Sequence, residues 1–183
     1  PSYHQLLTYY RPKILLGLTA TPERMDGKDI LAYFDQRIAA EIRLPEAIER
    51  SLLCPFQYFG VTDAVDLDSL KWSRGDYEKN ELSKLYTGND LRTMMIIKAL
   101  TKYITDLEEV KGLGFCVSKD HAAYMAERFH AAHIPSISLT ADSSEEERHT
   151  AKKKLVGGEI RFIFVVDLYN EGVDIPEVNT ILF

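Results

Sequence analysis

The sequence has no long hydrophobic run, little cysteine and no excess of basic residues. Because no stretch of about 18 apolar residues or signal peptide is present, we expect a soluble cytoplasmic protein that does not enter a membrane. Cys54 and Cys116 lie far apart and outside any metal-binding spacing, which fits a reducing compartment. With 28 acidic against 22 basic residues, any nucleic-acid binding must rest on a local patch rather than on net charge.

The composition is that of a globular protein. Of 183 residues, 45% are hydrophobic and 27% are charged, which suits one full domain and part of another. The chain begins at Pro1 without an initiator methionine and stops at Phe183 inside a predicted strand. We therefore expect it to be excised from a longer polypeptide.

The C-terminal half alternates strands and helices. Apolar runs and helical periodicities predict strands over residues 113–117, 134–139, 160–166 and 178–183, and helices over 119–133 and 145–156. Short connections between such elements are typical of an α/β fold, in which a parallel sheet carries helices on both faces in three αβα layers.

The N-terminal part is less regular. Its patterns predict strands over residues 13–18, 36–44 and 55–61, short helices over 28–34, 46–53 and 76–86, and a long helix capped by Asn89 or Asp90 that runs to about residue 106. Residues 1–54 supply too few elements for a core of their own. We therefore place a domain boundary near Cys54 and expect domains over residues 1–54 and 55–183.

A polar loop follows the strand at residues 160–166. It contains Asp167, Asn170, Gly172 and Asp174. In an open parallel sheet, ligands bind beyond the carboxyl ends of the strands, and Gly172 permits close backbone approach while Asp174 can accept hydrogen bonds from a ribose. The competing interpretation is that Asp167 and Asp174 cap turns and Gly172 is an ordinary loop glycine.

Two other strand ends carry hydroxyl groups. Thr19 and Thr21 follow the first predicted strand, where they could bond a neighbouring carboxylate or simply cap a turn. Ser118 and Lys119 open the helix at 119–133, where free N–H groups could bind a phosphate or Ser118 could act only as an N-cap. The histidines complete no metal-ligand set, so we predict no metal site.

Together and in this order, the segments resemble superfamily 2 helicases, the ATP-dependent nucleic-acid motors built from two RecA-like lobes. The branch they are most similar to is that of DEAD/DEAH-type helicases related to type III restriction subunits and to the excision-repair helicase subunit. Residues 18–22 resemble motif III, 115–118 motif IV, 140–148 the segment after it, 166–176 motif V, and 44–56 the passage between lobes.

The resemblance implies a role for each strand end. Thr19 and Thr21 would contact the metal-binding acidic motif of the first lobe and relay nucleotide state to strand separation. Ser118 and Lys119 would hold nucleic-acid phosphate.

The motif V segment would touch both ligands. Asp167 and Asn170 would face nucleic acid, and Gly172 and Asp174 would approach ATP. Val166 stands where many relatives carry threonine, so any phosphate contact there would use the main chain.

Motifs that such a motor needs are missing from these residues. The chain has no phosphate-loop sequence and no Asp-Glu-x-His motif, which should lie upstream, while the arginine-rich motif VI should lie beyond Phe183. The resemblance thus implies that residues 1–54 are the tail of the first lobe and 55–183 the second lobe. We expect the longer protein to use ATP and Mg²⁺, and the 183 residues alone to bind neither and to lack ATPase.

The expected function is part of an ATP-dependent helicase or translocase acting in restriction or repair, with DNA as partner and RNA as the open alternative. A rival hypothesis is a non-motor α/β domain that binds a nucleotide or small molecule. Another is a protein-interaction module that docks through residues 62–88. Copies of the chain could also form a strand-exchanged or edge-paired homodimer through residues 13–18.

Overall fold

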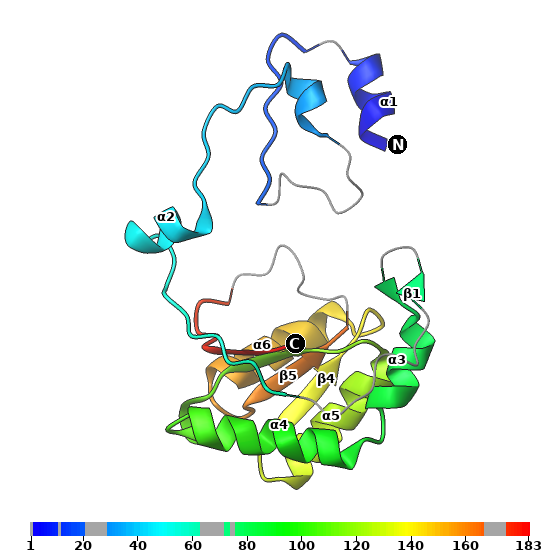
Figure 1. Ribbon diagram of the computed structural model, residues 1–183, viewed down its shortest axis with the longest axis vertical. Coiled ribbons are helices and arrows are strands. Elements are labelled where there is room, and N and C mark those ends of the chain that lie inside the picture. The colour runs from blue at the N-terminus through cyan, green and yellow to red at the C-terminus, as the bar shows by residue number, and fades with distance from the viewer. Residues whose placement is uncertain (1, 11, 21–28, 63–71, 74–75, 167–174) are drawn as a thin grey trace. The chain divides into compact units, whose positions relative to one another are not determined.

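The computed structural model describes all residues except 1, 11, 21–28, 63–71, 74–75 and 167–174 (Figure 1). It divides into a first unit, Pro1–Tyr58, and a second unit, Phe59–Phe183. Across the described ranges, none of the helices has both the length and the apolar character needed to cross a membrane.

The first unit contains only short helices among its described residues: α1 (Ser2–Tyr9), the 3-10 helix η1 (Leu31–Phe34) and α2 (Leu44–Glu49). The strands expected over residues 13–18 and 36–44 do not form, and neither does the strand expected over 55–61. Those predictions were wrong because an apolar run becomes a strand only when a neighbour takes up its N–H and C=O groups, and the described part of this unit offers no such neighbour. The α1 helix was not predicted.

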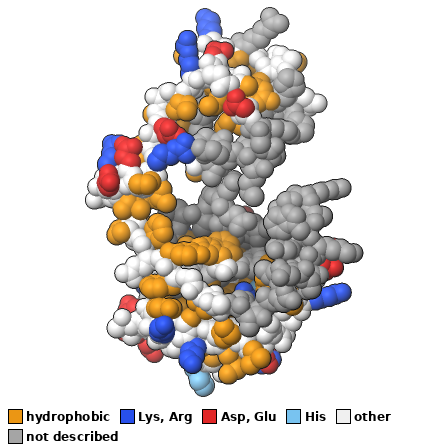
Figure 2. Space-filling view, in the orientation of Figure 1, with side chains coloured by type: hydrophobic (Ala, Val, Ile, Leu, Met, Phe, Trp, Pro, Cys, Tyr) orange, Lys and Arg blue, Asp and Glu red, His pale blue; other side chains and the backbone are white. Residues whose placement is uncertain are grey.

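Exposed apolar side chains are spread over the first unit (Figure 2). Ile14, Leu16 and Leu18 are 86%, 71% and 91% exposed, and Ala47 is the one buried hydrophobic residue among those described in this unit. The unit therefore has little core. The expected pairing of chain copies through residues 13–18 stays a prediction.

The second unit begins with elements that lead to its sheet. A small antiparallel pair, β1 (Trp72–Ser73) and β2 (Asp76–Tyr77), precedes α3 (Lys79–Tyr86), so the helix expected from residue 76 starts three residues later. The long helix is confirmed as α4 (Asp90–Tyr103), and the Asn89 side chain caps it by accepting from the Arg92 backbone N–H (3.0 Å). Phe59 stacks on Tyr103 at 4.2 Å between ring centroids, which ties residue 59 to the end of α4 instead of to a strand.

The sheet of the second unit is parallel, as predicted. After the 3-10 helix η2 (Leu107–Glu109) come β3 (Gly112–Phe115), α5 (Lys119–Ala131), β4 (Ser136–Leu139), α6 (Glu145–Val156), β5 (Phe162–Val165) and β6 (Thr180–Leu182). The four strands lie side by side in the order β4-β5-β3-β6, and every neighbouring pair is parallel.

Helices cover both faces of this sheet, which confirms the three-layer arrangement (Figure 1). The chain moves one way across the sheet from β3 to β4 and back again from β4 to β5. Since parallel crossovers are right-handed, α5 and α6 must lie on opposite faces. Alternate residues of β5 meet them, Phe162 and Phe164 packing under α5 while Ile163 and Val165 pack under α6.

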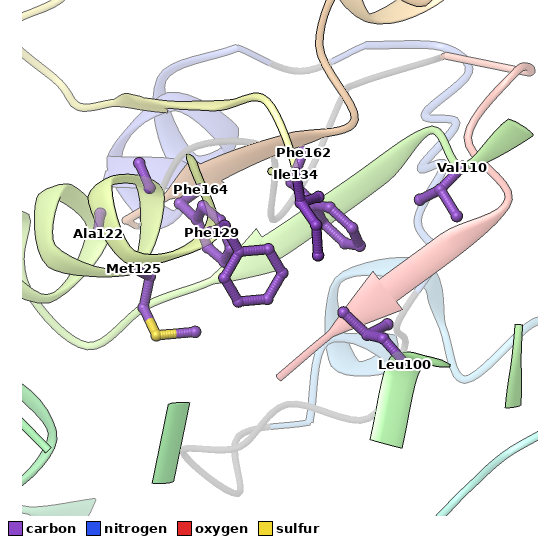
Figure 3. Close-up of a cluster of buried hydrophobic side chains, with 9 residues drawn as sticks. Leu100, Val110, Ala122, Met125, Phe129, Ile134, Phe162 and Phe164 are labelled. Atoms are coloured by element: carbon purple, nitrogen blue, oxygen red, sulfur yellow. The ribbon is translucent and has the colours of Figure 1, made fainter. Parts of the chain in front are cut away.

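Three phenylalanines form the centre of the α5 face (Figure 3). Phe129 of α5 meets Phe162 and Phe164 edge-on, with ring centroids 5.2 and 4.9 Å apart. The neighbouring strand, β3, has glycine at the two positions that face the Phe162 and Phe164 rings. A Cβ at Gly112 would lie 2.1 Å from the Phe162 ring, and one at Gly114 would lie 2.3 Å from the Phe164 ring. Side chains on β3 and rings on β5 therefore exclude one another at this face.

Side chains from neighbouring helices lock α4 against α5. Tyr124 donates its hydroxyl to Asp90 (2.7 Å), and the Arg128 guanidinium pairs with the same carboxylate (2.9 Å). On the opposite face, α6 begins with a capping box in which Ser144 and Glu147 exchange hydrogen bonds. The backbone N–H of Ser144 holds the pKa of the Glu147 carboxyl below its usual value.

Candidate functional site

Three strands of the sheet end level with one another. The register pairs Phe115 with Val165 and Val165 with Leu139, so the residues that follow β3, β4 and β5 emerge at one edge, with β5 in the middle. Since all three are parallel, this is the carboxyl edge, where α/β sheets bind ligands.

Ser118 and Lys119 follow β3 at this edge. The half-buried Ser118 is the N-cap of α5, and its hydroxyl accepts a hydrogen bond from the His121 backbone N–H (3.1 Å). The capping role is thus confirmed, and phosphate binding stays a prediction. The Lys119 ammonium forms an ion pair with the Asp142 carboxylate in the loop after β4. This pair joins the loops on either side of the carboxyl end of β5.

The loop after β4 is held by its own hydrogen bonds. Ser143 accepts from the Thr140 backbone N–H (3.1 Å), and the Thr140 hydroxyl accepts from the Asp142 N–H (3.3 Å). Arg148 of α6 donates to the Ala141 carbonyl (3.0 Å). The Asp142 carboxylate therefore projects from an ordered turn toward Lys119.

The C-terminal end of α3 packs beside the start of α5. The hydroxyl oxygens of Ser83 and Ser118 are 2.6 Å apart. The Arg92 guanidinium stacks over the Tyr86 ring at 4.1 Å from its centroid, and Tyr86 meets the His121 ring at 5.6 Å. Side chains of α3, α4 and α5 thus meet at the start of α5.

His121 is a buried neutral imidazole beneath this edge. Only 4% of the residue is exposed, and its Nδ1 accepts from the Val117 backbone N–H (3.4 Å), which assigns the ring proton to Nε2. Burial, and then the positive charge of Arg92, lowers the pKa of His121 to about 4.

Burial also raises the pKa of the Cys116 thiol to about 12, so this cysteine has no nucleophilic thiolate at neutral pH.

Most of the other predicted site residues are outside the described part of the chain, namely Thr21, Asp167, Asn170, Gly172 and Asp174. The described residues flanking the last four are Val166, directly after β5, and the buried Ile175. Thr19 is exposed in the first unit, in a segment without regular secondary structure. Within the described ranges, no three histidine, cysteine, aspartate or glutamate side chains gather in a way that could hold a metal ion.

Sequence reasoning missed Ser83, Arg92 and Asp142 as neighbours of the site. Ser83 lies 35 positions before Ser118, and Asp142 lies 23 positions after Lys119. No local pattern links residues so far apart, and residues 62–88, which include Ser83, were considered only as a docking surface. Asp142 could have been suspected from topology, because it follows a strand that ends at the same edge.

Residues 95–183 match the family described as the helicase conserved C-terminal domain. The chain is 24% identical over 176 residues to a 51.5 kDa protein of Lactococcus phage (isolate 7-9), covering 96% of this chain and 37% of that protein. It is 24% identical over 187 residues to the putative ATP-dependent helicase IRC3 of Saccharomyces cerevisiae, covering 99% of this chain and 27% of that protein. The chain therefore spans well under half the length of these relatives.

A solved structure is also similar, the C-terminal domain of the Sulfolobus solfataricus SWI2/SNF2 ATPase. The match has a TM-score of 0.45 and 15% identity, and covers 63% of this chain and 58% of that one.

Proposed function

We propose that the chain supplies the second RecA-like lobe of an ATP-dependent nucleic-acid helicase or translocase, because residues 95–183 match the helicase conserved C-terminal domain family. The whole protein would couple ATP hydrolysis to strand separation or movement along the strand. The observation that supports a binding role for this lobe is the row of strand ends at one sheet edge, where the cap of α5 and Lys119 lie together.

The start of α5 would hold a phosphate of the nucleic-acid backbone. The N-terminus of a helix carries unpaired N–H groups and a partial positive charge, and Ser118 and Lys119 add a hydroxyl and an ammonium. In this structure the Lys119 ammonium is paired with the Asp142 carboxylate. Both side chains of the pair are more than half exposed (56% and 75%), so separating them costs only about 0–1 kcal/mol. A phosphate could therefore replace the carboxylate with little loss.

The two residues of this ion pair should have opposite effects on nucleic-acid binding when each is replaced. We expect Lys119→Ala to weaken binding of a single-stranded oligonucleotide and to reduce the slope of log K against log salt by about 0.7, the value for one phosphate contact. Asp142→Asn should strengthen binding, because the ammonium no longer has an internal anion. Both are measured by fluorescence anisotropy over a salt series.

Lys154→Ala is the matched control, since it removes an exposed lysine from the last turn of α6. It should leave the slope unchanged. An unchanged slope for Lys119→Ala would rule out a phosphate contact at this residue. Parallel titrations with DNA and RNA of the same sequence test the expected preference for DNA.

ATP hydrolysis is proposed for the whole protein and not for these residues alone. The 183 residues contain no phosphate-loop sequence, and that loop is what cradles a triphosphate and positions Mg²⁺. We expect no nucleic-acid-stimulated phosphate release from the 183-residue chain, and clear release from a protein that also carries the missing motifs. Steady hydrolysis by the short chain, after purification to remove contaminating ATPases, would contradict this division of roles.

A further inference from the structure

The hydroxyl of Ser83, on α3, lies 2.6 Å from that of Ser118. We propose that Ser83 is a positioning residue, which donates its proton to Ser118 and so turns the Ser118 proton outward to nucleic-acid phosphate. This inference rests on the proposed function, since it gives Ser118 a phosphate to bind.

Either hydroxyl can donate across the 2.6 Å between them, and the proposed direction follows from what a phosphate needs from Ser118. A serine hydroxyl has one proton to donate and two lone pairs that accept. Ser118 already uses one lone pair for the backbone N–H of His121 (3.1 Å). If Ser118 donated its proton to Ser83, it would have no proton left for a phosphate, whose ionised oxygens only accept hydrogen bonds. If Ser83 donates instead, both lone pairs of Ser118 are filled and its proton is the free group.

The surroundings hold Ser83 where it can do this. It lies in the last turn of α3, three residues before Tyr86. The Tyr86 ring contacts both the Arg92 guanidinium (4.1 Å) and the His121 ring (5.6 Å). The same His121 donates the backbone N–H that fills the other lone pair of Ser118. Both partners that orient Ser118 therefore belong to one packed cluster, and α3 has a defined role at the sheet edge.

Removing the Ser83 or the Ser118 hydroxyl should weaken phosphate binding without changing the charge of the protein. We expect Ser118→Ala to weaken binding by about tenfold, the usual size for a hydrogen bond to a charged group, and Ser83→Ala by about threefold. Because a serine is neutral, neither change should alter the salt slope, unlike Lys119→Ala. The double variant should bind no worse than Ser118→Ala, since Ser83 acts only through Ser118.

The test measures affinity for a single-stranded DNA oligonucleotide at fixed salt, together with the thermal midpoint, for Ser83→Ala, Ser83→Thr, Ser118→Ala and the double variant. Ser83→Thr keeps the hydroxyl and should restore binding, which a merely structural role would not predict. Thr101→Ala, which removes an exposed hydroxyl of α4, is the control and should bind as the parent does. Wild-type or tighter binding by Ser83→Ala, with Ser118→Ala weakened, overturns the positioning role and leaves the proposed function standing. Wild-type binding by Ser118→Ala overturns both the positioning role and the Ser118 contact, and the salt slope of Lys119→Ala then shows separately whether the helix start binds phosphate.

Discussion

Replacing Phe129 with alanine should lower the free energy of unfolding by about 3–5 kcal/mol, the range for large aromatic side chains removed from a core. Phe129 is fully buried and meets Phe162 and Phe164 edge-on (Figure 3). Alanine would remove the ring that holds both strand phenylalanines against the sheet. Because these two rings already fill the space left by Gly112 and Gly114, they have little freedom to close the cavity.

Urea unfolding followed by circular dichroism measures this effect. Leu91→Ala is the control, because Leu91 is a large apolar residue of the same unit that is mostly exposed, and its replacement should change stability by no more than about 0.5 kcal/mol. A loss of less than about 1 kcal/mol for Phe129→Ala would mean that this cluster is not the core of the unit.

The fold of the second unit could be predicted because local pattern and tertiary pairing agree there. The apolar residues of α5 recur at helical spacing, and β5 is a short apolar run with buried side chains on both faces. Each of β3, β4, β5 and β6 also pairs with a parallel neighbour within the same unit. The apolar pattern, the turns and the pairing therefore all specify one arrangement.

The first unit could not be predicted in the same way. Residues 13–18 have the composition of a buried strand, but a strand is defined by hydrogen bonds to a neighbour, and composition does not say whether a neighbour exists. The result is a segment with exposed Ile14, Leu16 and Leu18. The prediction failed because the described residues of this unit include no partner strand, and not because the hydrophobic pattern is weak.

The candidate site was predictable only in its local part. The N-cap role of Ser118 follows from its place before a helix, and the structure confirms it. The Lys119–Asp142 pair and the Ser83–Ser118 contact depend on which loops and helices meet at the sheet edge. Those contacts are set by strand order, β4-β5-β3-β6, which no spacing in the sequence specifies.

A buried histidine in the first turn of α5 should make stability sensitive to acid. Burial and the charge of Arg92 hold the pKa of His121 at about 4 in the folded protein, against 6.5 for a free imidazole. As the pH falls below 6.5, the unfolded chain takes up a proton that the folded protein refuses, so the stabilising effect is complete above pH 6.5 and is lost progressively toward pH 4. At 1.36 kcal/mol per pKa unit, the loss at pH 5 is about 2 kcal/mol.

A comparison of two variants isolates this contribution from the carboxylates that titrate at the same time. His121→Asn keeps an oxygen able to accept from the Val117 N–H but cannot be protonated, so the free energy of unfolding should fall less between pH 7.5 and 5 than in the parent, by about 2 kcal/mol. His149→Asn, on an exposed position of α6, is the control and should retain the parent's pH profile. If His121→Asn loses as much stability on acidification as the parent, the imidazole must take up its proton in the folded state. His121 would then contribute nothing to the loss of stability in acid, and burial of its ring would not be the cause.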